Sequence, residues 1–283
     1  MSDIRNIMSV DVEEWFHILD VDGPRIQQWA FLPGRVESNF LYLLDQFDKF
    51  DVKVTCFFLG WIAERYPKLV QEAVRRQHEI ASHGYAHELI QHQSRSQFAW
   101  DVKKTKEILE QISGTEVIGY RAPGFSVHSS TRWALEELVV AGYRYDSSIF
   151  PTRHGHGGML GAQTKPHEIH TAAGSIFEFP ISIASFFGRP TCFFGGGYLR
   201  LFPYFLIRKK AGQVNADNRP VIFYVHPREV DPAHPRLTMS VRRYFKSYFN
   251  LASTRRKLEC VLREQNVGPF RRWLELPSRV AAA

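Results

Sequence analysis

Hydrophobic residues recur along this chain with two different spacings, which predicts helices that alternate with strands. Val36, Phe40 and Phe47 belong to an apolar set with helical periodicity, so residues 35–50 are expected to form an amphipathic helix. Residues 52–59 form a continuous apolar run, which is typical of a strand buried on both faces of a parallel sheet. Further strands are expected at residues 4–10, 79–82, 117–121, 143–145, 176–179 and 221–225. Further helices are expected at residues 62–76, 96–112, 198–210 and 238–265, and from Ser129 or Ser130 to Gly142.

This alternation covers nearly the whole chain and predicts an α/β fold with a parallel sheet, either barrel-like or doubly wound. No linker composition divides the sequence. We therefore expect one domain over residues 1–283, with a core at about 4–230 and a helical appendage at about 236–283.

The composition excludes a chain that is disordered as a whole. Of 283 residues, 44% are hydrophobic and 23% are charged, which is ordinary for a globular protein. Lys and Arg number 36 against 29 Asp and Glu, a formal net charge of +7, and the excess gathers from Arg208 onward. Such a segment forms either a solvated helix face or a contact with an anionic membrane surface or acidic glycan. No nucleic-acid-binding motif accompanies the charge, so no nucleic acid is expected as a partner.

The cysteines and the N-terminus bear on the compartment. Cys56, Cys192 and Cys260 are odd in number and form no C-x-x-C pair, so a disulfide scaffold is not expected and a reducing compartment is favoured. The first residues lack the apolar core and cleavage site of a signal peptide. We expect a cytoplasmic protein, with the inner face of the membrane as an alternative site. The sequence does not predict the oligomeric state.

Polar residues follow five of the expected strands. In a β/α barrel the active site lies at the C-terminal ends of the strands, so these side chains are expected to meet there. They are Asp11 and Glu13, then His83 and His87, then Arg121, Asp146 and His226.

Two of these groups point to metal chemistry. His83 and His87 are four residues apart, and one helical turn or a tight loop can aim both imidazoles at one divalent transition metal, with zinc favoured. In an extended segment Asp11 and Glu13 point to the same side while Val12 points to the barrel wall. One carboxylate can then ligate the metal and the other can accept a proton. The structural alternatives are a chance pair of histidines and a solvated acidic turn.

The remaining groups suit positioning and proton transfer. The fork of Arg121 can hold a carboxylate ionised in one orientation, and His226 can protonate a leaving amine. Asp146 can orient such a histidine or tune its pKa. A surface arginine, a satisfied core histidine and a turn-forming aspartate are the corresponding structural alternatives.

Taken in order, these segments resemble the polysaccharide deacetylase family, also called the NodB-homology family. The tail after His226 is similar to the extension of a subgroup associated with exopolysaccharide and O-antigen gene clusters. The matching segments are Ser9-Val10-Asp11-Val12-Glu13, Ser82-His83-Gly84-Tyr85-Ala86-His87, Tyr120-Arg121-Ala122-Pro123-Gly124, Tyr145-Asp146-Ser147-Ser148-Ile149 and Phe223-Tyr224-Val225-His226-Pro227.

The resemblance implies a distorted (β/α) barrel and metal-dependent removal of N-acetyl groups from the amino sugars of a cell-surface polysaccharide or its lipid-linked precursor. It implies Asp11 as the catalytic base, Arg121 as the residue that positions it, and His226 as the general acid with Asp146 near it. His83 and His87 would be metal ligands. Candidate substrate contacts are Tyr120, Pro123, Phe193 and Phe194. The last two precede three glycines and would form an aromatic lip, with core packing as the alternative.

The first motif departs from the common pattern of the family. Val12 stands where most members carry a second aspartate, so Glu13 would take the role of metal ligand, as in relatives with a D-V-D motif. Gly84 stands where serine or threonine is common. Two other functions are therefore kept open: a cyclic-imide or allantoin-type amide hydrolase on the same fold, and a metal-free, non-catalytic glycan-binding protein.

Overall fold

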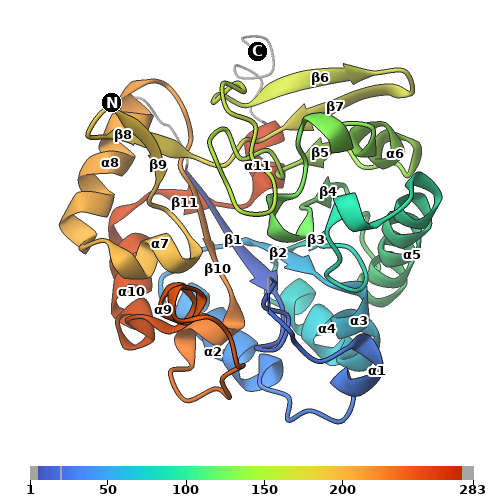
Figure 1. The fold of residues 1–283 in the computed structure, drawn as a ribbon, viewed down its shortest axis with the longest axis horizontal. Helices are drawn as coiled ribbons and strands as arrows, with labels where there is room; N and C mark the ends of the chain where they lie inside the picture. Colours follow the sequence, from blue (N-terminus) through green and yellow to red (C-terminus); the bar gives the residue numbers. More distant parts are fainter. Residues whose placement is uncertain (1–5, 20, 276–283) are drawn as a thin grey trace.

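A mostly parallel sheet forms the centre of the protein (Figure 1). The structure is a computed structural model that describes residues 6–19 and 21–275. Neighbouring strands follow the order β10-β1-β2-β3-β4-β5-β7-β6, and β11 pairs with β1. The strands of this sheet are β1 (Asn6–Val12), β2 (Thr55–Phe58), β3 (Glu79–Ser82), β4 (Gly119–Tyr120), β5 (Tyr145–Asp146), β6 (His167–Thr171), β7 (Gly174–Glu178), β10 (Ile222–Val225) and β11 (Val267–Gly268). The predicted α/β class and parallel sheet are confirmed, although Ile4 of the first expected strand lies outside the described residues.

The sheet curls into a barrel that stays open on one side. Among the described residues, no ladder of hydrogen bonds joins β7 to β10. Ser182 bridges this gap, because its Oγ donates to the carbonyl of Pro220 at 3.1 Å and accepts from the amide of Ile222 at 2.9 Å. A parallel bridge between Gly195 and Tyr224 fills more of the gap. The barrel is thus distorted, as the family resemblance implied.

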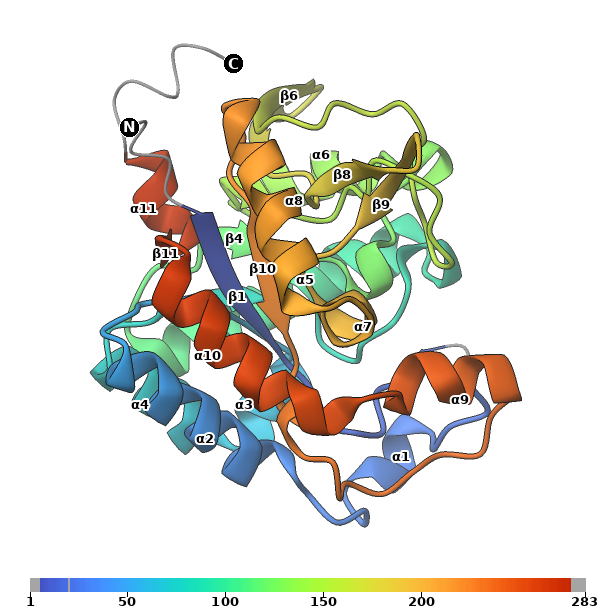
Figure 2. The same ribbon diagram turned by 90° about the vertical axis from the view of Figure 1, so that its left-hand side faces the viewer.

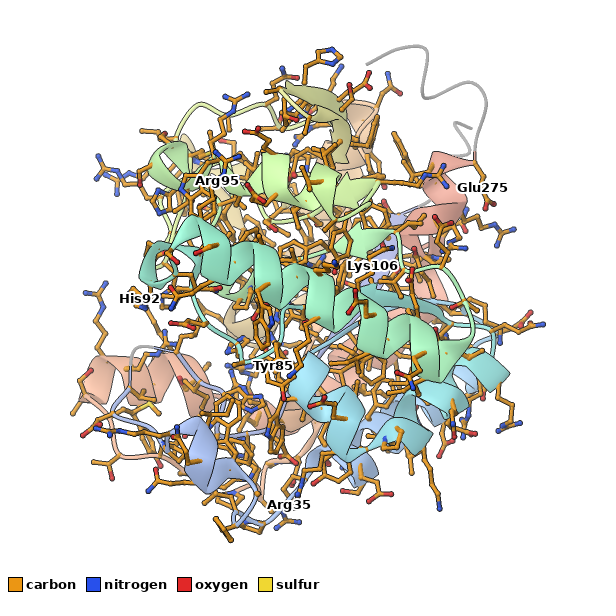
Figure 3. The ribbon with its side chains drawn as sticks, turned by 90° about the vertical axis from the view of Figure 1, so that its right-hand side faces the viewer. Arg35, Tyr85, His92, Arg95, Lys106 and Glu275 are labelled. Carbon is orange, nitrogen blue, oxygen red and sulfur yellow. The ribbon has the colours of Figure 1, made fainter. Side chains whose placement is uncertain are left out.

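Helices cover the outer face of the sheet (Figure 1). Figure 3 shows α5 crossing this face, with Arg95 near one end. The expected helix at 35–50 is confirmed as α2, and that at 96–112 as α5. The helices are α1 (Ile26–Trp29), α2 (Val36–Lys49), α3 (Gly60–Arg65), α4 (Pro67–Arg75), α5 (Arg95–Ser113), α6 (Ala134–Val140), α7 (Gly196–Leu201), α8 (Tyr204–Ala216), α9 (Val241–Tyr248), α10 (Thr254–Glu264) and α11 (Phe270–Leu274).

Three of the expected helices are each broken once where the backbone cannot continue. Pro67 occupies the first turn of α4 and separates it from α3. Pro203 separates α7 from α8 in the same way. Asn250 has a φ of 54° between α9 and α10, which is a left-handed conformation that ends a helix. Each long expected helix is therefore two shorter ones that meet at an angle.

Antiparallel pairs are the elements that the sequence did not predict. β6 pairs with β7, and β8 (Ile183–Phe186) pairs with β9 (Arg189–Cys192) in a separate hairpin. Gly188, at the tip of that hairpin, has a φ of 74°, which glycine adopts without strain. These hairpins follow β5, where the regular alternation of strand and helix ends.

The C-terminal segment is part of the barrel as well as a cover for it. Phe270 and Trp273 of α11 pack in the cluster of barrel-interior side chains with Phe57, Tyr145 and Phe179. Figure 2 shows α11 beside the start of β1, whereas α1 and α9 lie beyond its other end. The extension thus closes one end of the barrel and borders the other. Within the described residues, no helix is both long enough and apolar enough to cross a membrane.

Candidate functional site

Strand β1 determines which carboxylates face the barrel interior. Side chains alternate across a strand, and Val10 and Val12 pack into the hydrophobic layer beneath the helices. Asp11 therefore points into the barrel, where it is 2% exposed. Glu13, two residues further on, is also buried and lines the same cavity. The expected separation of Val12 from the two carboxylates is confirmed.

Arg121 follows β4 and lies completely buried beside Asp11. Its Nη1 donates to Oδ1 of Asp11 at 2.6 Å and to Oγ of Ser9 at 2.8 Å, and its Nη2 donates to Oγ of Ser147 at 3.2 Å. The guanidinium also lies 4.2 Å from the ring centre of Phe57. Because its planar fork is fixed by these partners, Arg121 holds Asp11 in one orientation.

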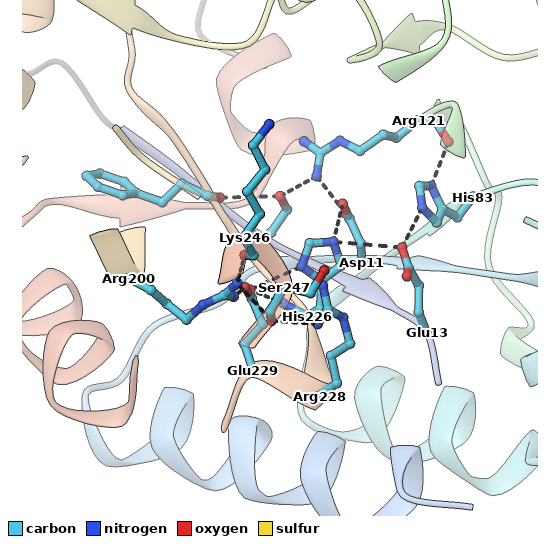
Figure 4. Close-up of polar contacts among 12 residues, drawn as sticks. Asp11, Glu13, His83, Arg121, Arg200, His226, Arg228, Glu229, Lys246 and Ser247 are labelled. Carbon is cyan, nitrogen blue, oxygen red and sulfur yellow. Dashed lines mark hydrogen bonds and ion pairs between the residues drawn. The ribbon is translucent and has the colours of Figure 1, made fainter. Parts of the chain in front are cut away.

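Glu13 lies between the two histidines of the H-x-x-x-H segment (Figure 4). Its Oε1 is 3.2 Å from Nε2 of His83 and 3.0 Å from Nε2 of His87. Burial opposes ionisation of Glu13, but His87, His226 and His83 together hold the pKa of this carboxyl well below its usual value. His87 has a φ of 52°, so its ring reaches the site from a strained, left-handed backbone.

These three residues fit a divalent metal. One donor atom from each of Glu13, His83 and His87 lies within 4.8 Å of the others, and all three residues are buried. Nδ1 of His83 is 2.7 Å from the carbonyl oxygen of Arg121, so it donates there, and Nε2 is the atom that would bind a metal. A carboxylate with two neutral imidazoles is a donor set that suits zinc and related ions.

His226 follows β10 and approaches the two carboxylates from the other side. Its Nε2 is 3.8 Å from Oδ2 of Asp11 and 3.8 Å from Oε1 of Glu13. Its Nδ1 is 3.1 Å from Oε2 of Glu229, a buried residue that the sequence analysis did not identify. Burial lowers the pKa of His226 to about 4, although Glu13 and Asp11 act in the opposite direction. Glu229 stands three residues after His226, at the start of a helical turn. This spacing in the sequence could have predicted the contact.

The partner expected for His226 was Asp146, and the structure places it elsewhere. Oδ1 of Asp146 accepts from Oγ of Ser148 at 2.5 Å, and its carboxyl lies beside that of Glu178. Burial raises the pKa of both carboxyls, that of Asp146 to about 6 and that of Glu178 well above its usual value. The expectation that Asp146 orients His226 is thus wrong. Four strands lie between β5, which carries Asp146, and β10 in the sheet order, and Glu229 fills the role locally.

A cavity of about 530 Å³ opens at this end of the barrel and contains the site. Five of the predicted residues line it, namely Asp11, Glu13, His83, His87 and His226. The glycines after Phe194 contribute Gly196 and Gly197, and the loop at residues 153–156 contributes His154 and His156.

None of the four expected substrate contacts lines this cavity. Phe193 and Phe194 are completely buried, Tyr120 is 1% exposed, and Pro123 is buried as well. The aromatic lip is therefore wrong, because the 193–195 segment runs alongside β10 and turns its phenyl rings into the core. The aromatic side chains that do line the cavity are Phe125, Tyr198, Tyr224, Phe245 and Phe249.

Two neighbours of the first motif have roles that the sequence did not reveal. Glu14 turns away from the histidines and accepts from the amides of Arg35 and Val36, at 2.8 and 3.0 Å, so it caps the start of α2. His17 lines the cavity, and its ring lies 5.8 Å from that of His87 in a stacked arrangement. The amide of Glu14 donates to Nδ1 of His17 at 3.2 Å. Glu13 is thus the carboxylate of this motif that meets the histidines.

Two family models match successive parts of the chain. Residues 22–145 match the polysaccharide deacetylase family, and residues 147–275 match a domain of unknown function, DUF3473. His83, His87 and Arg121 lie within the first match, and His226 and Glu229 lie within the second. Asp11 and Glu13 precede both matches, so the site combines residues of both matched regions with two residues that lie before them.

Curated relatives match a shorter stretch. The peptidoglycan-N-acetylglucosamine deacetylase of Bacillus cereus is 30% identical over 96 residues, which are 34% of this chain and 35% of that protein. The peptidoglycan deacetylase of Helicobacter pylori is 29% identical over 107 residues, 38% of this chain and 36% of its own length. The matched region thus spans about a third of these relatives.

Two solved structures resemble the fold along nearly the whole chain. A candidate polysaccharide deacetylase from Mycobacterium smegmatis has a TM-score of 0.65 at 20% identity and covers 95% of this chain and 90% of its own. The allantoinase PuuE has a TM-score of 0.59 at 17% identity, with coverages of 93% and 85%. At these identities the likeness concerns the fold. The family match itself covers residues 22–145, less than half of the chain.

Proposed function

We propose that the protein is a metal-dependent hydrolase that removes N-acetyl groups from amino sugars of a bacterial cell-surface polysaccharide or its precursor. The observation that carries this proposal is the convergence of an arginine-held carboxylate, Asp11, with the Glu13–His83–His87 cluster in one cavity. The deacetylases named among the relatives act on peptidoglycan and support the same reaction class. An amide carbonyl needs both an activated water and a way to protonate the departing nitrogen, and the cavity offers side chains for each.

Glu13, His83 and His87 would hold the metal, with zinc favoured by this donor set. When bound, a divalent cation supplies Lewis acidity, which polarises a carbonyl oxygen and makes a neighbouring water more acidic. The role of Glu13 rests on its position between the two imidazoles. Val12, the residue at the common aspartate position of the family, packs in the core instead.

Asp11 acts as the base in this proposal. Oδ1 is occupied by Arg121, so Oδ2 is the oxygen that can accept a proton from the attacking water. Arg121 holds this carboxylate in one orientation. Since Arg121 also binds Ser9 and Ser147, its own position is fixed from two further strands or turns.

His226 carries the proton to the leaving nitrogen. Glu229 accepts from Nδ1–H, which leaves Nε2 as an acceptor near Oδ2 of Asp11. A low pKa means that His226 is neutral at rest, so the proton that it delivers is one taken up during the reaction. In this scheme the proton passes from the attacking water to Asp11, then to Nε2 of His226, and finally to the amine. No proton is gained or lost, and both residues return to their starting protonation states.

The proposal extends to the domain organisation of the chain and to the compartment and pathway in which the protein acts. We infer that residues matched by the two family models form one domain, because Tyr145 of β5 pairs with Phe177 of β7 and Phe270 of α11 packs in one cluster with Phe57. All three cysteines are free, which supports a reducing compartment such as the cytoplasm. An exopolysaccharide or O-antigen pathway remains part of the proposal through the resemblance of the C-terminal extension.

Release of acetate from an N-acetylglucosamine tetramer, measured with zinc and after chelation, tests this function. We expect zinc-dependent release that is lost in Asp11→Asn. Hydrolysis of allantoin without release of acetate from any acetylated sugar would instead identify a cyclic-amide hydrolase. Retention of the tetramer without metal and without turnover would identify a glycan-binding protein.

A further inference from the structure

One wall of the cavity is strongly basic. Arg228 lies two residues after His226, and α9 contributes three more cationic side chains; all four line the cavity together with Asp11, Glu13 and His226. These residues are Arg228, Arg242, Arg243 and Lys246. Figure 4 shows Arg228 beside His226, and Lys246 on the neighbouring segment. The basic wall, defined by these four residues, therefore borders the centre at which we place the reaction.

The position of this wall is fixed by the buried Arg200. Arg200 forms an ion pair with Glu229 and donates to the carbonyls of Lys246 and Ser247, at 2.8 and 3.1 Å. It donates as well to the carbonyl of Phe249 at 3.2 Å. The charge of Arg200 is thus compensated, and its donors hold α9 against the cavity.

Within the described residues, three charges of the basic wall, those of Arg228, Arg242 and Lys246, are not compensated in the same way. Within residues 6–19 and 21–275, no ion pair involves Arg228, Arg242 or Lys246. Nη1 of Arg228 has a long contact of 3.4 Å with the carbonyl of Ser247. Carbonyl oxygens accept hydrogen bonds but do not neutralise a full positive charge.

Arg228 is held where its charge is costly. It is half-buried in the wall, and burial lowers the pKa of its guanidinium, with the charge of Arg243 acting in the same direction. The charge of Glu13 stabilises it from across the cavity. The like charges of Arg228, Arg242 and Lys246 around one partly enclosed space repel each other, and a bound anion would reduce this repulsion.

Apolar aromatic surface lies beside these charges. Phe245 is 51% exposed and Phe249 is 40% exposed, and both line the cavity. Their ring centres are 4.5 Å apart. Exposed phenyl rings next to cationic groups suit a ligand that has a flat apolar face and a negative charge, as an acidic sugar has.

We propose that the substrate carries a carboxylate or phosphate close to its acetamido group, and that Arg228, Arg242 and Lys246 bind this anion while Phe245 and Phe249 contact a sugar ring. This inference rests on the proposed function, since it specifies the substrate class of the same site. A uronic acid unit and the diphosphate of a lipid carrier present the same chemistry to these residues.

Three probes separate the sources of the anion. They are the neutral N-acetylglucosamine tetramer, a tetrasaccharide that alternates N-acetylglucosamine with glucuronate, and N-acetylglucosamine linked through diphosphate to a short polyprenol. We expect kcat/KM for acetate release to be higher for one of the two acidic probes than for the neutral one. In Arg242→Gln/Lys246→Gln, the ratio of acidic to neutral kcat/KM should fall about tenfold or more, mainly through KM. In Arg228→Gln the ratio should also fall, and Arg228→Lys should recover part of it.

The matched control is Arg256→Gln/Arg272→Gln, which removes two exposed positive charges from the same C-terminal segment outside the cavity. It should keep the ratio of the unmodified protein, and an equal fall in this control would show a general charge effect and overturn the inference. Equal kcat/KM for neutral and acidic probes would also overturn it while the deacetylase function stands. If no probe releases acetate, binding of the glucuronate and diphosphate probes is measured by calorimetry. Binding to the unmodified protein that is lost in Arg242→Gln/Lys246→Gln would support the anion site and reject the deacetylase function. Absence of binding to the unmodified protein would reject both.

Discussion

Nη1 of Arg121 lies 2.6 Å from Oδ1 of Asp11, and both side chains are buried at the closed side of the cavity. This contact leaves Asp11 with one oxygen, Oδ2, that faces Nε2 of His226 at 3.8 Å. The two ends of one carboxylate thus have different partners, a permanent cation and a titratable imidazole. Such an arrangement suits a base whose direction is fixed before the substrate arrives.

Asp11→Asn should therefore abolish turnover without removing the metal. An amide oxygen cannot accept the proton of the attacking water, so we expect a loss of about 10²–10⁴-fold in the rate of acetate release. Elemental analysis of the same preparation should show unchanged metal content. Loss of metal together with activity would make Asp11 a ligand and reject its assignment as the base.

Metal content should depend on Glu13, His83 and His87. Glu13→Gln keeps the shape of the side chain but removes its charge, and metal affinity should drop by more than about tenfold. His83→Ala and His87→Ala should lose the metal while circular dichroism shows an intact fold. His170→Ala, which removes an exposed histidine of β6, is the matched control and should keep full occupancy. Full occupancy in all three site variants would contradict the proposed metal centre.

His226→Ala should slow amide hydrolysis far more than hydrolysis of an activated aryl acetate. A sugar amine leaves poorly unless it is protonated, whereas an activated aryl oxide leaves without help. The ratio of the two losses in kcat/KM measures the role of the acid. Glu229→Gln, which weakens the partner of Nδ1, should show the same selectivity to a smaller degree. If both substrates slow equally, the acid is another group, with His154 and His156 as the next candidates.

The buried carboxyl pair of Asp146 and Glu178 should make the protein less stable as pH rises. Carboxyls ionise near pH 4 in an unfolded chain, whereas burial raises the pKa of Asp146 to about 6 and that of Glu178 further from its usual value. Above pH 4 the folded state therefore binds more protons than the unfolded state, so the free energy of unfolding falls with pH, by up to about 1.4 kcal/mol per pH unit for each extra proton.

Glu178→Gln removes the carboxyl that binds one of these extra protons in the folded state. Urea unfolding at pH 5 and pH 8 should show a smaller loss of stability for this variant than for the unmodified protein. Glu168→Gln, at an exposed position in the adjacent β6, should keep the original pH dependence. An identical pH dependence for Glu178→Gln would show that the pair is ionised throughout and would reject the linkage.

Local sequence patterns predicted the parts of the molecule that local forces determine. The helical spacing of apolar residues in α2 reflects burial of one face of the helix. The continuous apolar run at β2 reflects burial of both faces of the strand. Strand alternation alone placed Asp11 and Glu13 inside and Val12 outside. The residues that follow strands β1, β3, β4 and β10 meet because parallel strands end on the same side of a sheet.

The failures concern contacts between distant segments. Asp146 follows a strand like the others, but its neighbour in space is Glu178 of β7, and only the tertiary fold reveals that β7 and not β10 lies beside β5. Phe193 and Phe194 carry no periodic pattern that would separate a core segment from an exposed lip. The basic wall depends on α9 folding back over the barrel mouth, which a count of positive residues cannot show.

The pairing of β1 with β10 has a consequence for how the protein folds. Ser9 and Phe223 are hydrogen-bonded although 214 residues separate them. Closing so long a stretch of chain costs entropy before any contact repays it, and such high contact order slows folding. During synthesis β1 must wait with one edge unpaired until β10 leaves the ribosome, which exposes a strand edge prone to intermolecular pairing. Asp11 and His226 consequently meet in the last stage of folding, so an incomplete nascent chain holds no assembled centre.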